Sequence, residues 1–277
     1  MATDVEQPET HDEGNDDELP RDEQTPVQRF VMPLTFGSLF AGVGGFDIGF
    51  ERAGMMPVWQ VEINEYCRAI LEQHWPNVRR HDDVRTFKAT SVDVVCGGFP
   101  CQDISNAGKR HGIEGERSGL WTEYHRIICE IRPRYVAIEN VSAILVRGIG
   151  TVLRDLAACG YDAEWDCLPA SAFGGYHERD RAFIVAYPAE QHGKSRNLLE
   201  AGEEWRTQFQ FRRLRSMVDA TERRERNIRF EREPRLARLV DGVPNRTHRL
   251  EALGNAVFPR VAEWIGRRIV RDAAFAA

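Results

Sequence analysis

The stretch that most constrains the fold is the run from Leu34 to Ala53, which reads as a strand, a glycine turn and a helix in succession. Leu34–Phe40 is a short apolar run typical of a buried strand, and an amphipathic run follows the glycines of segment 41–45. Gly54 then caps the helix and Pro57 stops its continuation. Such a turn offers backbone N–H groups to a nucleotide-like cofactor, and tight packing of helix on strand is the alternative interpretation.

A carboxylate follows the next expected strand. Val58–Val61 is that strand, and it ends in Glu62, twenty residues after Gly42. A carboxylate at this place can accept hydrogen bonds from both hydroxyls of a ribose, and an ordinary acid at a helix start is the alternative. A crossover helix is expected over 64–75. Asp83 then sits where a third strand should end, which makes it a candidate acceptor for an adenine amino group, although paired aspartates are also common in turns.

The loop Gly97–Ser105 follows a second short apolar run, Asp93–Cys96, which predicts a buried parallel strand. Two glycines allow a sharp turn at the carboxyl edge of the sheet, where open α/β sheets bind ligands. Pro100 stiffens this turn and presents the thiol of Cys101 at a loop tip. Most free cysteines are small buried hydrophobes, but the surrounding residues make a poor core, so a nucleophile is favoured.

The same edge is expected to carry an acid. The segment 107–119 is glycine-rich and charged, which favours a lid over the site. A helix over 120–131 and a strand over 134–138 follow, and this strand ends in Glu139. A carboxylate at the carboxyl end of a central strand, on the edge that carries Cys101, is well placed for acid/base chemistry.

The remaining elements continue the alternation of helices and strands. A helix is expected over 149–159, and strands over 161–168 and 182–187. Arg179 and Arg181 stand two residues apart beside the last strand, so both can grip a phosphate or a base edge, and a solvated charge cluster is the alternative.

Charge is distributed unevenly along the 277 residues. Residues 1–30 carry ten acids and two arginines, a net charge of −8, which leaves +2 of the total −6 for the rest. The segment 191–240 carries thirteen Lys and Arg against eight acids. The acidic head has too few apolar residues to fold and is expected to be disordered. The basic segment is compatible with a polyanionic partner, and a solvated insertion is the alternative.

Composition also bears on the compartment. No apolar run approaches the roughly 18 residues of a membrane span, and the acidic N-terminus does not read as a signal peptide. The six cysteines show neither a C-x-x-C pair nor zinc spacing, which favours reduced thiols in a cytoplasmic setting.

Four motifs together resemble the DNA (cytosine-5)-methyltransferase family, with bacterial and phage enzymes nearest in style. They occur in the family's order and are Phe-Ala-Gly-Val-Gly-Gly at 40–45, Gly-Phe-Pro-Cys-Gln at 98–102, Glu-Asn-Val at 139–141 and Gly-Asn-Ala-Val at 254–257. The resemblance covers residues 34–187 and 239–270. It implies an α/β, Rossmann-like S-adenosylmethionine-dependent methyltransferase fold, with a mostly parallel sheet and helices on both faces.

The domain organisation that the resemblance implies has four parts. They are a disordered acidic tail at 1–33, a catalytic domain at 34–187, a short target-recognition insert at 188–240, and a segment at 241–277 that completes the catalytic domain. Two departures from the family stand out. His177 replaces the glutamine of a Gln-x-Arg-x-Arg motif, and the insert is short, so the recognition sequence is expected to be short or relaxed.

The resemblance also assigns roles. Cys101 attacks C6 of a cytosine flipped out of double-stranded DNA, Glu139 assists at N3, and Arg179 and Arg181 hold the nucleotide and orient Glu139. The cofactor is S-adenosylmethionine, which leaves as S-adenosylhomocysteine, and no metal is implied. The residues implied to bind it are Phe40, Gly42, Gly44, Glu62, Asp83, Pro100, Asn255 and Val257.

Partners and alternatives follow from the same resemblance. DNA is the expected partner, and no membrane is involved. The protein is expected to be a monomer in the cytoplasm of a prokaryote or of a phage-infected host. The resemblance also allows a cognate restriction endonuclease as a partner. Three alternatives stay open: the same chemistry on tRNA, a non-catalytic nucleic-acid-binding protein that kept the fold, and an unrelated nucleotide-binding protein.

Overall fold

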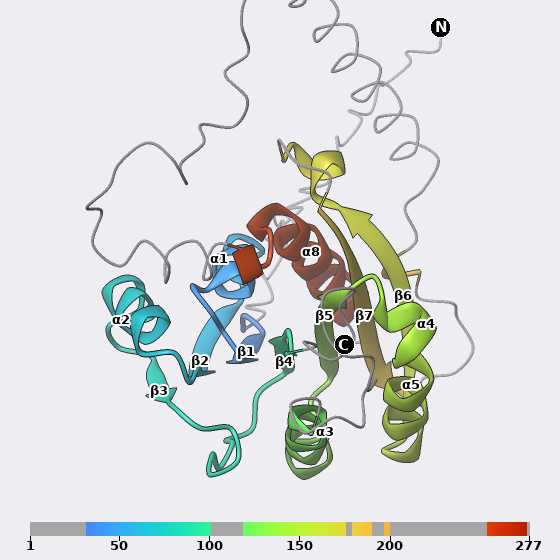
Figure 1. The fold of residues 1–277 in the computed structure, drawn as a ribbon, viewed down its shortest axis with the longest axis horizontal. Coiled ribbons are helices and arrows are strands. Elements are labelled where there is room, and N and C mark those ends of the chain that lie inside the picture. The colour runs from blue at the N-terminus through green and yellow to red at the C-terminus, as the bar shows by residue number, and fades with distance from the viewer. Residues whose placement is uncertain (1–31, 101–118, 176–178, 190–196, 200–253, 276–277) are drawn as a thin grey trace, which may run out of the picture. The chain divides into compact units, whose positions relative to one another are not determined.

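In the computed structural model, residues 32–100, 119–175, 179–189, 197–199 and 254–275 are described. Those from Pro33 onward belong to one compact unit built on a single sheet of seven strands in the order β3-β2-β1-β4-β5-β7-β6 (Figure 1). The strands are β1 (Thr35–Leu39), β2 (Met56–Val61), β3 (Arg79–His81), β4 (Val94–Gly97), β5 (Tyr135–Val141), β6 (Tyr161–Pro169) and β7 (Asp180–Pro188).

The first five strands run parallel, and β7 runs antiparallel between β5 and β6. The carboxyl ends of β1, β2, β4 and β5 therefore lie along one edge of the sheet. The chain leaves β1 toward β2 on one side and later enters β4 on the other, so the strand order reverses beside β1. A reversal of this kind opens a crevice in which α/β proteins bind ligands.

Helices cover both faces of the sheet, as the sequence predicts (Figure 1). On one face, α3 (Leu120–Ile131), α4 (Ile144–Arg147) and α5 (Ile149–Ala158) pack on a core that includes Trp59, Val95 and Val136. On the other face, α1 (Gly45–Arg52) and α8 (Pro259–Phe275) pack on Phe36, Val94 and Tyr135. The remaining helical segments are α2 (Glu65–His74) and the short 3-10 turn η2 (Ala170–Phe173).

Local sequence explains where the helices beside the crevice begin and end. Gly44 precedes α1 with a φ of 83°, a left-handed conformation that favours glycine. Gly54 follows the helix with a φ of 90°, which confirms it as the terminating residue. The side chain of Asn64 accepts a hydrogen bond from the backbone N–H of Cys67 at 3.2 Å and so caps the start of α2.

Three boundaries differ from those predicted. The strand expected to end at Ile138 continues to Val141, because β7 pairs with it through Glu139, Asn140 and Val141. The second strand begins at Met56 and so includes Pro57, which lies opposite Phe36 beside the point where the register of β1 and β2 shifts. The third strand is only Arg79–His81, so Asp83 lies two residues after the strand and not at its end.

The prediction that all cysteines are reduced thiols is wrong for one pair. Cys129 in α3 and Cys159, directly after α5, form a disulfide. The two helices pack on the same face of the sheet, and this brings the Cα atoms to 5.9 Å, within the range that a disulfide spans. The other cysteines of the described residues, Cys67, Cys96 and Cys167, take no part in a disulfide.

Several predictions lie outside the described residues. They concern the acidic tail up to residue 31, the Cys101 loop and lid over 101–118, His177, and the insert over 200–240. Within the described part of the chain, no helix is both long and apolar enough to cross a membrane.

Candidate active site

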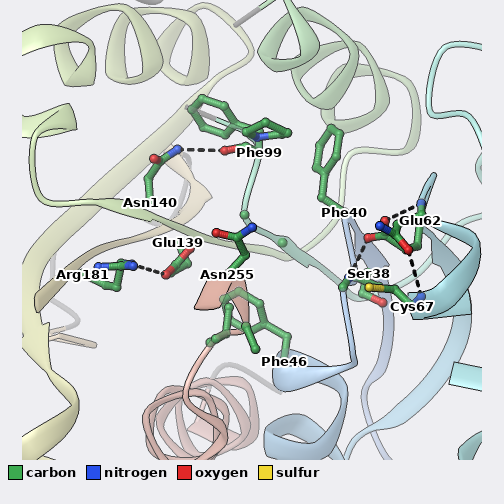
Figure 2. A pocket seen from close by; sticks show the side chains of 18 of the residues that line it. Ser38, Phe40, Phe46, Glu62, Cys67, Phe99, Glu139, Asn140, Arg181 and Asn255 are labelled. Atoms are coloured by element: carbon green, nitrogen blue, oxygen red, sulfur yellow. Dashed lines mark hydrogen bonds and ion pairs between the residues drawn. The ribbon is translucent and has the colours of Figure 1, made fainter. Parts of the chain in front are cut away.

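A pocket of about 420 Å³ lies at the carboxyl edge of the sheet, where the strand order reverses (Figure 2). Its walls come from segments far apart in the sequence. They are Ser38, Phe40, Ala41, Gly42 and Phe46; Glu62, Ile63, Asn64 and Cys67; Gly97–Pro100; Glu139–Val141; Arg179 and Arg181; and Asn255–Val257.

Glu62 organises one side of this pocket. Its carboxylate accepts a hydrogen bond from the backbone N–H of Gly42 at 2.7 Å and another from that of Asn64 at 2.8 Å. Burial raises the pKa of Glu62, while these backbone hydrogen bonds oppose the rise. Gly42 has a φ of 57° and open space where a Cβ would lie, so a ligand can approach its backbone. The sequence prediction that joined Glu62 to this turn therefore corresponds to a direct contact.

The turn after β4 lies close to the acid on β5. A Cβ on Gly98 would lie 2.8 Å from Oε2 of Glu139, so a side chain at this position would displace that carboxyl group. The side-chain amide of Asn140 donates a hydrogen bond to the carbonyl of Phe99 at 3.2 Å and fixes the turn against β5. Pro100 ends the described part of the turn, and Cys101 is the next residue in the sequence.

Glu139 is a buried acid with a cationic neighbour. Only 7% of the residue is exposed, and Nε of Arg181 lies 3.1 Å from its Oε1 (Figure 2). Burial raises the pKa of Glu139 to about 7, although the charges of Arg181 and Arg179 pull it down. Burial also lowers the pKa of Arg179. A carboxyl group with a pKa near neutrality can both donate and accept a proton, as acid/base catalysis requires.

The end of the chain completes the pocket. Asn255 and Val257 both line it, as the sequence predicts, and in Figure 2 Asn255 lies between the Glu139–Arg181 pair and Glu62. A Cβ on Gly45 would overlap the carbonyl oxygen of Val257, so this glycine lets the C-terminal segment approach the start of α1.

Two of the predicted cofactor residues do not line the pocket. Asp83 accepts hydrogen bonds from the backbone N–H and the guanidinium of Arg85, and the latter lowers the pKa of Asp83. Gly44 lies against the ring of Trp75. Conversely, Ser38, Phe46, Ile63 and Cys67 line the pocket without having been predicted, because neighbouring motifs alone do not show which side chains point inward.

A second cluster lies on another part of the molecule. Nε2 of His125 is 3.5 Å from the sulfur of Cys129, 3.2 Å from that of Cys159 and 3.0 Å from the carbonyl of Asp155. Histidine and cysteine are common metal ligands, but the two sulfurs of this cluster are joined in the disulfide and are therefore not thiolates that could bind an ion. The spacing His-x₃-Cys within one helix is the sequence pattern that points to this cluster.

Comparison with known proteins identifies the family to which this chain belongs. The model of the C-5 cytosine-specific DNA methylase family matches residues 34–232, and the chain belongs to that family. Two relatives are bacterial. The Type II methyltransferase M.Bsp6I of Bacillus sp. (strain RFL6) is 35% identical over 174 residues, which are 59% of this chain and 55% of that protein. The Type II methyltransferase M2.BsuMI of Bacillus subtilis (strain 168) is 33% identical over 158 residues, which are 54% of this chain and 41% of that protein.

The solved structure of the S. pombe Dnmt2 methyltransferase supports the fold. It matches with a TM-score of 0.51 at 21% identity and covers 61% of this chain and 56% of that chain. The predicted Rossmann-like methyltransferase fold is thereby confirmed. The chain spans about half the length of the curated relatives that it matches.

Proposed function

We propose that this protein transfers a methyl group from S-adenosylmethionine to C5 of a cytosine in DNA. The observation that carries the proposal is the approach of the Gly98–Pro100 turn to Glu139, a buried acid with a pKa of about 7. That turn leads directly into Cys101, the proposed nucleophile. Membership of the cytosine-specific family and the Type II methyltransferase relatives support the same reaction.

The residues of the pocket fit S-adenosylmethionine. Each oxygen of the Glu62 carboxylate accepts one backbone hydrogen bond and keeps acceptor capacity for ribose hydroxyls. Open space beside Gly42 admits the ligand to the backbone, and Phe40 and Phe46 offer apolar surface. When bound there, the cofactor supplies the methyl group. Pro100, Asn255 and Val257 are proposed as further contacts of the cofactor. Gly44 is proposed to act indirectly, through the left-handed conformation of the turn that holds the cofactor. Asp83 is proposed to contact the cofactor from outside the lining of the pocket.

Cysteine and glutamate have complementary tasks in the proposed reaction. The thiolate of Cys101 forms a bond with C6 of the cytosine, and the electron pair displaced into the ring is neutralised as Glu139 gives a proton to N3. C5 then has the electron density to accept a methyl group. Water then takes the proton from C5, the thiolate leaves as the bond to C6 breaks, and the proton on N3 returns to Glu139, which restores the aromatic ring and the starting state of both side chains.

The substrate and partners are proposed on the same basis. The target base must leave the helical stack to reach this pocket, and double-stranded DNA is the proposed partner. Arg179 and Arg181 line the pocket beside Glu139 and are proposed to hold the flipped nucleotide. The catalytic domain is proposed to comprise 34–187 with 241–277, and the segment 188–240 to read the DNA. A cytoplasmic monomer, with or without a cognate restriction endonuclease, remains the proposed setting.

The test is to compare the wild-type chain with Cys101→Ala in methyl transfer and in covalent trapping. The variant is expected to lose methylation while it still binds S-adenosylhomocysteine and keeps its thermal stability. A duplex containing 5-fluorocytosine should trap the wild type but not the variant, because fluorine at C5 blocks the final elimination. Full activity of the alanine variant would overturn the assignment of the nucleophile, and methylation of RNA alone would overturn the choice of substrate.

A further inference from the structure

A buried carboxylate lies beneath the pocket and plays no part in the chemistry above. Asp47, in the first turn of α1, is fully buried and faces side chains of the neighbouring strands β1 and β2. Its Oδ1 accepts a hydrogen bond from the hydroxyl of Ser38 at 2.8 Å and another from the side-chain amide of Gln60 at 2.8 Å. Its Oδ2 is buried and has no hydrogen-bond partner within the described part of the chain.

Ser38 connects this carboxylate to the pocket. The residue is 1% exposed, yet it is one of those that line the pocket (Figure 2). A hydroxyl group has one proton to donate, and Ser38 donates it to Asp47. The lone pairs on its oxygen therefore remain for a donor group in the pocket. A negative charge on Asp47 strengthens such an acceptor, because hydrogen bonds in a chain polarise one another in a low-dielectric interior.

We propose that Asp47 is a positioning residue of the cofactor pocket, whose ionised carboxylate holds the Ser38 hydroxyl so that its oxygen accepts a hydrogen bond from a donor group of the bound cofactor. The inference rests on the proposed cofactor but not on the methyl-transfer chemistry. The ligand group is a hydrogen-bond donor, of the ammonium or hydroxyl type, and S-adenosylmethionine carries both.

The surroundings of Asp47 place its titration in an observable range. Burial, together with the nearby carboxylate of Glu51, raises the pKa of Asp47 to about 6 against the opposing effect of the hydrogen bonds from Gln60 and Ser38. On β4, the buried thiol of Cys96 has a raised pKa and is neutral near pH 7. The guanidinium of Arg80 donates a hydrogen bond to Oε1 of Gln60 at 3.3 Å, so this charge acts on Asp47 through Gln60. The added proton would go to Oδ2, because Oδ1 already accepts two hydrogen bonds.

The direction of the pH effect follows. Cofactor binding through Ser38 favours ionised Asp47, so this part of the affinity is complete above pH 6 and declines as the pH falls through about 6. Glu62 and Glu139 also line the pocket and have raised pKa values, so the wild-type profile contains their contributions too. The diagnostic quantity is therefore the difference between the wild type and a variant that lacks only the Ser38–Asp47 contact.

The experiment is calorimetric titration of the full chain with S-adenosylhomocysteine between pH 5 and 8. The variants are Ser38→Ala, Asp47→Asn and the double variant, and thermal unfolding reports whether each is folded. Thr35→Val is the matched control, because Thr35 lies on the same strand and its hydroxyl donates to Asp93 at 2.8 Å outside the pocket. Each single variant is expected to bind about tenfold more weakly at pH 7.5, and the control should bind like the wild type.

Two outcomes support the inference and two overturn it. The double variant should bind no more weakly than the single variants, since both remove the same contact. Ser38→Ala should also lack the change in affinity near pH 6 although Asp47 is intact, which tests the inference even if Asp47→Asn does not fold. Additive losses, or an unchanged pH profile in Ser38→Ala, would show that Asp47 only holds the fold together. A wild-type chain that does not bind the ligand would instead refute the proposed cofactor.

Discussion

A buried acid such as Glu139 has an energetic cost as well as a proposed chemical use. Its side chain is almost wholly removed from water, and two arginines only partly compensate for the lost solvation of the carboxylate. The pKa of about 7 in the folded chain lies well above the ordinary value for glutamate. The unfolded chain therefore ionises more easily than the folded one between the two values, and this difference disfavours the fold at neutral pH.

Glu139→Gln should for this reason stabilise the fold at high pH. Because the folded pKa is raised, the stability contributed by protonated Glu139 is complete below the ordinary pKa of glutamate and is lost as the pH rises through about 7. The variant is expected to be more stable than the wild type by roughly 3 kcal/mol at pH 8, and the two should converge near pH 4.5. Urea unfolding across this range measures the difference, with methyl transfer expected to fall sharply. A stability difference that does not change with pH would contradict the burial argument.

At the scale of elements, the contact between α1 and α8 places the C-terminal segment at the pocket. The helices approach closely because glycines face the contact: a Cβ on Gly49 would lie 2.5 Å from Cβ of Ala262 and 2.7 Å from the carbonyl oxygen of Pro259. A Cβ on Gly266 would lie 2.8 Å from that of Ala53. Since Asn255 and Val257 precede α8, the position of this helix determines where they line the pocket.

Gly49→Ala should therefore destabilise the protein even though alanine has the higher helix propensity. The added methyl group meets backbone atoms that cannot move alone, and overpacking of this kind costs about 1–3 kcal/mol. Gly150→Ala in α5 is the matched control, because a Cβ there meets nothing within 4 Å and alanine should add about 0.5–1 kcal/mol. Urea unfolding of both variants provides the comparison. Equal effects at the two sites would show that the α1–α8 contact can relax.

The elements also show what could be predicted from the sequence. Helix 120–131 matches its prediction, and the strands on the pocket edge were placed correctly, since apolar runs and glycines mark them locally. The extension of β5 depends on pairing with β7, forty residues later, and no local pattern contains that information. The same holds for the Cys129–Cys159 pair, which two separate helices bring together. Asp47 can be noticed in the sequence as an acid within the run Gly-Phe-Asp-Ile-Gly-Phe. Its hydrogen-bond partners on β1 and β2 become apparent only in the fold.

For the whole molecule, the charge of the acidic head opposes that of the rest. Residues 1–30 carry a net charge of −8 and the remainder carries +2. DNA is a polyanion, and binding to it depends mainly on cations that contact phosphates. The head is therefore expected to contribute nothing to DNA affinity and to repel DNA at low salt.

Deletion of residues 1–30 should leave the turnover number unchanged and should not weaken DNA binding. Because the repulsion is screened by salt, any gain in affinity of the shortened chain should be largest at low ionic strength. Titration of a labelled duplex at several salt concentrations, together with steady-state methylation, measures both effects. A large loss of turnover in the shortened chain would mean that the head takes part in catalysis.

The disulfide between Cys129 and Cys159 closes a covalent loop in the chain. The loop contains β5 and therefore Glu139, whereas Cys101 precedes it in the sequence. A single break in the backbone between the two cysteines opens the loop without releasing a fragment. The proposed acid would thus stay tethered to the part of the chain that carries the nucleophile, and the two pieces would separate only after the sulfur–sulfur bond is reduced.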